Sequence, residues 1–447
     1  MEEFPDEVLE KIFSWCTFQD LVWNIPDVNI RWRMVSTRPK IWENRTFRPR
    51  KEDDDEKIIS VLKRCPRLQA VNFGERVVAE KVLIALASTC ADLVKLRLHS
   101  SQSISCEILN ELQNKCPKIE YFNISRETLT SAEKMEIIGK FMNLKSIHSE
   151  WSDCSVNLKP IADGCPRLQC LEAGYIRVEL DDLKYFLSKK KDTLRTLVLP
   201  CSISGEFNKC TIPCLSVCTA LESLGIHWNC ENEPKLLART LGSLKTLKSL
   251  TWQDFDVHSI DDMSHLFGNK NLAHLVRLEF CSFFLYNDAV TKIIVENCPN
   301  LQGLHLGVCE EFTDKTMEML IDLQYLKEIG IYGNDNLTDE GMKCLLRIKQ
   351  LEYLLLGGCN GLTVLTFCVL TSYTHLKVLK FQCQSLKNLP WHTFSDQLKD
   401  LRHIDIYRCK DLNVLALKAL KEKMPLVTFS VDETSQLWAG YETNQFE

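Results

Sequence analysis

Apolar and polar residues follow a regular pattern along most of this chain. The pattern is leucine-x-x-leucine-x-leucine, where other large apolar residues can replace leucine, and it returns after every 24 to 28 residues. A period of roughly 20–45 residues is typical of repeat proteins, in which each unit buries its apolar face against its neighbours. The sequence therefore predicts a solenoid of about fifteen repeats. Their first apolar positions are Leu68, Leu93, Ile119, Leu144, Leu168, Leu194, Leu221, Leu247, Leu275, Leu301, Leu326, Leu351, Leu376, Leu401 and Leu426.

Each repeat contains two local periods. In Leu304-His305-Leu306 apolar and polar residues alternate, which predicts a strand with one buried face. Thr313 and Thr338 then precede runs with apolar residues three and four apart, which predicts helices with a threonine N-cap. The apolar residues of these runs are Met317, Leu320, Ile321, Met342, Leu345 and Leu346. We therefore expect an α/β fold, a curved solenoid with parallel strands on its concave face and helices on its convex face.

The first 46 residues do not follow the repeat. Pro5, followed by the acidic Asp6 and Glu7, predicts a helix start. Many large apolar residues follow, which predicts a small helical module. Because a segment of about 40 residues rarely stabilises itself, its apolar side chains need to be covered by the repeats or by another protein.

This N-terminal segment resembles the F-box family. The family pattern is found as FPDEVL at residues 4–9, Ile12-Phe13, Asp20-Leu21, VNIRW at residues 28–32 and PKIW at residues 39–42. Phe4 replaces the usual leucine, and Pro26 falls inside the second helix, which it is expected to shorten or kink. The resemblance implies that residues 1–46 dock on a Skp-family adaptor, which is linked to a cullin scaffold. The residues implied in the adaptor contact, or in the packing that supports it, are Pro5, Leu9, Ile12, Phe13, Leu21, Val28, Trp32 and Trp42. The alternative is that residues 1–46 merely cap the first repeat, since solenoid ends need caps.

Residues 58–432 resemble the cysteine-containing subclass of leucine-rich repeats. The best match is CPNLQGLHLGVCEEFTD, residues 298–314. The charged residues 47–57 are expected to form a junction between the two modules. Residues 433–447 are expected to be a tail that caps the last repeat, with a path back over the concave face as the alternative.

The 21 cysteines follow the repeat and do not suggest disulfide partners. Six of them stand three residues before a first apolar position: Cys65, Cys90, Cys116, Cys165, Cys218 and Cys298. Free cysteine behaves as a small buried apolar residue, and an odd total fits a reducing compartment. The sequence therefore predicts buried thiols.

A separate cysteine group raises the question of a metal site. Cys210, Cys214 and Cys218 are four residues apart, and Cys201, His227 and Cys230 lie nearby in sequence. This spacing differs from that of zinc knuckles and ribbons. An irregular repeat with buried thiols is favoured and no metal site is predicted, with a metal site as the alternative.

Composition and motifs exclude several classes of function. The net charge of −6 argues against a general nucleic-acid-binding protein. The acidic N-terminus and the lack of any run of about 18 apolar residues argue against a membrane protein and favour the cytoplasm or nucleus. Phosphate-binding, dinucleotide-binding, hydrolase and zinc-protease motifs are all missing from the sequence, so neither an enzyme nor a cofactor is expected.

The two resemblances together imply the substrate-recognition subunit of a Skp–cullin–F-box ubiquitin ligase. The F-box would bind the adaptor, and the concave face of the repeats would bind the protein to be ubiquitylated. Inward-facing aromatic and charged residues in the late repeats are the candidate substrate-binding residues: Tyr332, Tyr353, Lys380, His403, Asp405 and Tyr407. The alternative is a repeat scaffold that assembles proteins and has no role in ubiquitylation.

Overall fold

The structure is a computed structural model of the 447-residue chain. It forms two compact units that divide after Cys201, and each unit is described by itself. The described residues are 4–43, 45–50, 52–74, 76–99, 101–149, 154–173, 176–198, 213–229, 234–256, 260–282, 286–308, 311–382, 391–407 and 414–432. Some side chains next to the gaps, among them those of His227 and Tyr407, lie outside this description.

The first unit begins with short helices. Pro5 is the N-cap of α1 (Asp6–Ser14), and acidic residues in its first turn favour the helix N-terminus. Pro26 lies in the 3-10 turn η2 (Ile25–Asp27), so the second helical segment is broken there, as expected for a residue without an N–H donor. The other elements of this part are η1 (Asp20–Asn24), α2 (Ile30–Ser36) and α3 (Pro39–Trp42).

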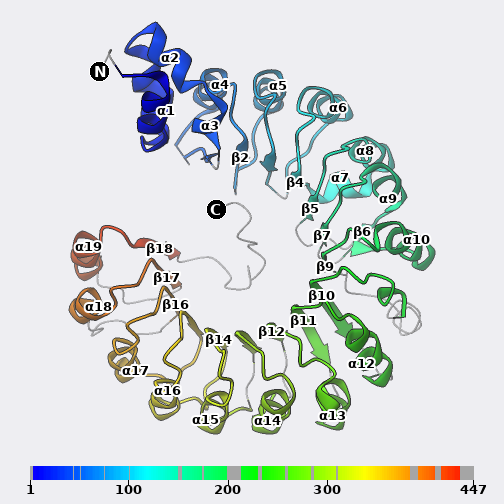
Figure 1. Ribbon diagram of the computed structural model, residues 1–447, viewed down its shortest axis with the longest axis vertical. Helices are drawn as coiled ribbons and strands as arrows, with labels where there is room; N and C mark the ends of the chain where they lie inside the picture. The colour runs from blue at the N-terminus through cyan, green and yellow to red at the C-terminus, as the bar shows by residue number, and fades with distance from the viewer. Residues whose placement is uncertain are drawn as a thin grey trace. The chain divides into compact units, whose positions relative to one another are not determined.

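The rest of the first unit alternates parallel strands with helices (Figure 1). The strand order is β1 (Thr46–Phe47), β2 (Ala70–Asn72), β3 (Lys95–Arg97), β4 (Tyr121–Asn123), β5 (Ser146–Ser149), β7 (Cys170–Ala173) and β9 (Thr196–Val198). The small strands β6 (Cys154–Ser155) and β8 (Ile176–Arg177) pair with each other. The helices are α4 (Asp55–Arg64), α5 (Glu80–Thr89), α6 (Cys106–Lys115), α7 (Arg126–Thr130), α8 (Ala132–Ile138), α9 (Lys159–Gly164) and α10 (Leu180–Lys190).

The second unit repeats the same plan. Its strands pair in chain order and in parallel: β10 (Ser223–Asn229), β11 (Ser249–Asp256), β12 (Arg277–Ser282), β13 (Gly303–Val308), β14 (Glu328–Tyr332), β15 (Tyr353–Gly357), β16 (Val378–Gln382), β17 (His403–Tyr407) and β18 (Thr428–Asp432). Its helices are α12 (Pro234–Ser243), α13 (Ile260–Phe267), η3 (Gly268–Lys270), α14 (Asp288–Asn297), α15 (Asp314–Leu320), α16 (Asp339–Leu345), α17 (Val364–Leu370), α18 (Trp391–Gln397) and α19 (Val414–Lys423). Within each unit the strands form an inner layer and the helices an outer layer (Figure 1). The predicted α/β leucine-rich-repeat fold is confirmed, and the strand surface opposite the helices is termed the strand face.

The repeat pattern explains the core. The leucines at the repeat's first positions, such as Leu68 and Leu326, are fully buried, and Thr313 and Thr338 cap α15 and α16 as predicted. Leu426 differs, because 83% of its surface is exposed. A repeat buries its leucines against both neighbours, whereas β18 is the last strand of the described chain and has one neighbour.

The cysteines that precede the leucines are buried free thiols, as predicted. Cys65, Cys90 and Cys116 each cap the C-terminus of a helix, and the Cys116 thiol donates to the Cys90 carbonyl of the preceding repeat at 3.4 Å. Desolvation by burial raises the pKa of Cys65 and Cys116 to about 12. These thiols are therefore packing groups that link successive repeats.

One repeat leaves room for only a short helix. The longest helix in the described part of the chain, α10, has 11 residues. None of the helices described has both the length and the apolar character that crossing a bilayer requires.

Candidate functional site

The N-terminal helices leave many large apolar side chains in contact with water. In α1, Leu9 and Phe13 are buried, whereas Val8, Ile12 and the C-cap residue Trp15 are 40%, 39% and 85% exposed. The full exposed set, termed the N-terminal apolar surface, comprises Phe4, Val8, Ile12, Trp15, Val28, Ile30 and Met34. Single exposed apolar residues are ordinary, but a dense group in a short segment is typical of an interaction site.

Ion pairs hold together the helices that carry this surface. Arg38, at the N-terminus of α3, donates to Asp6 at 2.8 Å and to Glu10 at 3.0 Å, both in α1. Arg31 of α2 lies 2.9 Å from Asp6. Most of these charged side chains are about one-third exposed, so each pair contributes on the order of 1 kcal/mol or less. The buried side chains of the module supply most of its stability.

The eight residues singled out by the F-box resemblance fall into two groups. Leu9, Phe13, Leu21 and Trp42 are at most 1% exposed and can act only through packing. Pro5, Ile12 and Val28 are exposed. Trp32 has intermediate exposure, and its ring centroid lies 5.1 Å from that of Phe13. The F-box resemblance did not single out the other five members of the exposed set, which are Phe4, Val8, Trp15, Ile30 and Met34. Helical spacing is the signal for Trp15, since Val8, Ile12 and Trp15 are four and three residues apart.

On the strand face of the second unit, charged and aromatic side chains from neighbouring repeats form a network. Asp405 of β17 is 3% exposed and lies 3.0 Å from Lys380 Nζ of β16 and 2.6 Å from His403 Nε2. Lys380 Nζ is also 6.0 Å from the ring centroid of Tyr353 on β15, a distance that permits a cation–π interaction. Three successive repeats thus contribute to one surface.

The network continues onto β12, β13 and β14. Arg277 donates to His305 Nε2 at 3.1 Å and forms an ion pair with Glu328. Burial alone would raise the pKa of Glu328, but the nearby His305 and Arg277 hold it below its usual value. The ring of His305 lies 5.5 Å from that of Tyr353. Gly330 pairs with His305 in the strand register, and a Cβ there would lie 2.6 Å from His305 Nδ1, so glycine leaves room for the ring.

Four of the six predicted substrate-binding residues meet in this network: Tyr353, Lys380, His403 and Asp405. Tyr332 of β14 is half buried in the same strand layer, and the side chain of Tyr407 lies outside the described residues. The alternating pattern identified the inward positions. The strand register determines which of them form pairs, so the burial of Asp405 between Lys380 and His403 was not predictable.

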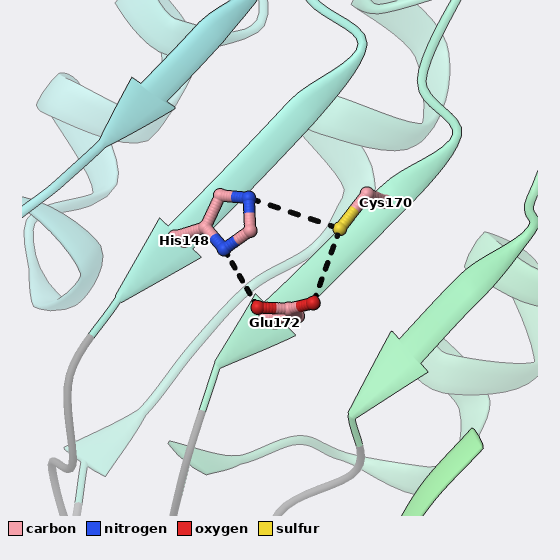
Figure 2. Close-up of side chains that lie close together, drawn as sticks. All are labelled: His148, Cys170 and Glu172. Carbon is pink, nitrogen blue, oxygen red and sulfur yellow. Dashed lines mark hydrogen bonds and ion pairs between the residues drawn. The ribbon is translucent and has the colours of Figure 1, made fainter. Parts of the chain in front are cut away.

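A third group of polar side chains lies on the strand face of the first unit. His148 of β5 meets Cys170 and Glu172 of β7 (Figure 2). His148 Nδ1 is 2.7 Å from Glu172 Oε2, and Cys170 Sγ is 3.9 Å from His148 Nε2 and 3.7 Å from Glu172 Oε1. All three residues are buried. The sequence prediction did not include them, although they occupy the polar positions of the successive repeats that begin at Leu144 and Leu168.

The cysteine group around Cys210, Cys214 and Cys218 lies only partly within the described residues. Cys201, Cys210 and Cys230, together with the His227 side chain, lie outside the described residues. Cys218 is buried and Cys214 is partly exposed. The burial of Cys218 therefore agrees with the prediction of buried thiols.

Comparison with known proteins finds similarity to part of a curated F-box/LRR-repeat protein. No family model matches the chain. The chain is similar to F-box/LRR-repeat protein 4 of Bos taurus, with 28% identity over 156 residues. The match covers 35% of this chain and 21% of the relative, so the chain spans about a fifth of that protein's length.

Solved structures with similar repeats are more distant. The complex of Rad7 and Elc1 in yeast matches with a TM-score of 0.47 and 14% identity, covering 95% of this chain and 92% of the other. The TLR13–ssRNA13 complex matches with a TM-score of 0.44 and 16% identity, covering 83% and 57%. The fold assignment rests on the strands and helices of this chain itself.

Proposed function

We propose that this chain, an F-box/leucine-rich-repeat protein, is the substrate-recognition subunit of a Skp–cullin–F-box ubiquitin ligase. The observation that carries the proposal is the N-terminal apolar surface. Exposing seven large apolar side chains to water is unfavourable, and a partner that covers them removes this cost. Since the surface lies on the residues that resemble the F-box, the proposed partner is a Skp-family adaptor, which would connect the chain to a cullin.

In this proposal residues 1–46 bind the adaptor and residues 58–432 form the repeat array, joined by residues 47–57 and followed by the tail 433–447. Pro5, Ile12, Val28 and Trp32 would contact the adaptor. The buried Leu9, Phe13, Leu21 and Trp42 would hold the contacting helices in place.

The strand face of the second unit is the proposed substrate-binding surface. Tyr353, Lys380 and His403 offer an aromatic ring, a cation and an imidazole on adjacent strands, with Tyr332 and Tyr407 on the same layer. Tyrosine is enriched at the energetic centres of interfaces. The ion pair with Asp405 holds the Lys380 ammonium in position, which lowers the entropy lost when a partner binds.

The proposed contribution to ubiquitin transfer is positional. Holding a substrate lysine near an activated ubiquitin raises its effective concentration without a catalytic group on the holder. The alternative is a repeat scaffold with no ubiquitin-ligase role. It would use the same strand face but would not need the N-terminal apolar surface for its activity.

Adaptor capture tests the proposal. We expect Ile12→Asp, which places a charge on an exposed apolar position, to weaken adaptor binding by about 2 kcal/mol or more, roughly thirtyfold in Kd. The matched control is Met142→Asp, because Met142 is an exposed apolar residue outside the N-terminal module. Equal adaptor binding by Ile12→Asp, Met142→Asp and the unaltered protein would contradict the F-box assignment.

Substrate binding is tested separately. The combined change of Tyr332, Tyr353 and Tyr407 to alanine should abolish capture of the substrate and leave adaptor binding intact. Adaptor-dependent ubiquitylation in a reconstituted ligase distinguishes the receptor from the scaffold. Unchanged substrate recovery by the triple variant would move the binding surface to another part of the chain.

A further inference from the structure

We propose that His148, Cys170 and Glu172 form a binding site for a zinc ion or a similar late first-row divalent cation on the strand face of the first unit (Figure 2). The three residues offer the nitrogen, sulfur and oxygen donors that zinc accepts in proteins. The proposal is independent of adaptor binding, because the N-terminal apolar surface shares no residue with this group.

The separations between the donor atoms suit a metal ion. Zinc binds sulfur at about 2.3 Å, and imidazole nitrogen and carboxylate oxygen at about 2.0–2.2 Å, which places tetrahedral ligand atoms about 3.5 Å apart. Cys170 Sγ is 3.7 Å from Glu172 Oε1 and 3.9 Å from His148 Nε2. One donor atom from each residue lies within 4.8 Å of the other two.

Both ring nitrogens of His148 lie beside polar side chains of the group. His148 Nδ1 is 2.7 Å from Glu172 Oε2, and His148 Nε2 is 3.9 Å from Cys170 Sγ and 2.5 Å from Ser146 Oγ. The Ser146 hydroxyl lies close enough to serve as a further oxygen donor.

Because the group is buried and contains a carboxyl side chain, a bound cation would stabilise it. His148, Cys170 and Glu172 are 6%, 5% and 8% exposed, and the Tyr121 ring stacks on His148 with 4.4 Å between centroids. Among the described residues, Glu172 has no lysine or arginine partner. A buried carboxylate without such a partner is costly, and a divalent ion would remove this cost.

The thiol distinguishes metal binding from nucleophilic chemistry. A Cys–His–Glu arrangement could also activate a cysteine nucleophile, which requires a thiolate that a substrate can reach. Here the Cys170 residue is only 5% exposed, so a substrate cannot reach its sulfur atom. The same sulfur lies 3.9 Å from His148 Nε2 and 3.7 Å from Glu172 Oε1, where an ion held between the three side chains would contact it.

A second observation comes from the neighbouring strand. Asn123 of β4 pairs in register with His148 and is 5% exposed. Its side-chain oxygen has no hydrogen-bond partner within the described part of the chain. Buried polar atoms are normally satisfied, and a water molecule bound to the metal would be a suitable donor. The ion would then tie β5 to β7 at the strand face, which is a structural role.

Metal titration of the untagged 447-residue chain tests the site. We expect zinc chloride to bind tightly, and cobalt chloride to give the near-ultraviolet charge-transfer band of a thiolate–cobalt bond. Cys170→Ser and Glu172→Gln should each weaken binding by about 100-fold or more, since even residues that only support the ligands account for 10–100-fold. Cys368→Ser, which removes an exposed thiol, is the matched control and should bind like the unaltered protein.

Cys201, Cys210 and Cys230 provide other thiols that could bind the added metal. Metal binding at the proposed site is therefore measured as the difference in zinc affinity and in cobalt band between the unaltered chain and Cys170→Ser. A thiolate–cobalt band that disappears in Cys170→Ser and persists in Cys368→Ser supports the proposal. The absence of this band in the unaltered protein would overturn it without depending on any variant. Equal zinc affinity in the unaltered chain, Cys170→Ser and Glu172→Gln would overturn it as well.

Discussion

Asp314 in one repeat holds Thr338 in the next: Asp314 Oδ1 accepts a hydrogen bond from the Thr338 backbone N–H at 2.9 Å, and Oδ2 accepts one from the Thr338 hydroxyl at 2.7 Å. The Thr338 hydroxyl also accepts from the Glu340 N–H at 3.2 Å and so caps α16. Thr338 is thus the N-cap of α16, while Asp314 links its own repeat to the following one. Equivalent pairs join Asp288 to Thr313 and Asp339 to Thr363.

Asp314→Ala should destabilise the second unit. The substitution leaves the Thr338 N–H and hydroxyl without this acceptor, and because Thr338 is exposed we expect a cost of about 0.5–1.5 kcal/mol. We expect a lower urea midpoint, measured by circular dichroism. Asp322→Ala is the control, because Asp322 is an exposed carboxylate just beyond the same helix. If the two variants unfold at the same urea concentration, the contact between repeats does not contribute to stability.

The stability of the first unit should depend on pH through Asp92. Asp92 accepts from Lys118 at 2.5 Å and from Arg67 at 2.8 Å, at equivalent positions of three successive repeats. Lys118 and then Arg67 hold the pKa of Asp92 below its usual value. A lowered pKa in the folded state stabilises the protein above the unfolded value of about 3.9, and this contribution is lost as the pH falls through the folded value.

Asp92→Asn is therefore expected to lower the free energy of unfolding at neutral pH by about 1 kcal/mol, a value reduced because both partners are more than half exposed. The difference from the unaltered protein should shrink towards zero as the pH falls below the unfolded pKa of about 3.9 and through the lower folded pKa of Asp92. Urea unfolding at several pH values measures the loss of stability at neutral pH and its decrease at low pH. A difference that stays constant across this range would show that Asp92 acts through shape and not through charge.

The buried thiols should resist chemical modification. Alkylation requires a thiolate, and desolvation raises the pKa of Cys65 and Cys116 to about 12 and that of Cys90 to about 11. Iodoacetamide at neutral pH should label the exposed Cys368 before these three thiols, which should react only after unfolding. Peptide mass spectrometry gives the order of labelling. We also expect a reducing agent to leave the melting temperature nearly unchanged, so a large fall would indicate a disulfide.

Leu9 and Ile12 should respond differently to substitution, although both belong to the F-box pattern. Leu9 is fully buried, so Leu9→Ala should destabilise the N-terminal module by about 2–5 kcal/mol. Ile12 is 39% exposed, and Ile12→Ala should change stability by about 0.5 kcal/mol. Hydrogen exchange of residues 6–42 measures this local stability. Equal protection in both variants would contradict the division into packing and contact residues.

Much of the fold was predictable from local spacing. Alternation over two residues identified inward and outward side chains in strands such as β14, and spacing of three and four identified α15 and α16 with their threonine caps. The phase of Cys65 and Cys90 relative to the leucines predicted their burial. Such features depend on residues close together in sequence, so the spacing of apolar residues along the chain is enough to predict them.

The sequence by itself determined the repeat, its strands and helices, the buried cysteines and the resemblance of residues 4–42 to the F-box. Only the tertiary structure decided that Leu9 is buried while Ile12 is exposed, and that His148 meets Cys170 and Glu172. The reason is physical. Spacing along the chain fixes the face on which a side chain lies, whereas its neighbours on that face are set by the packing of helices and the register between strands from different repeats.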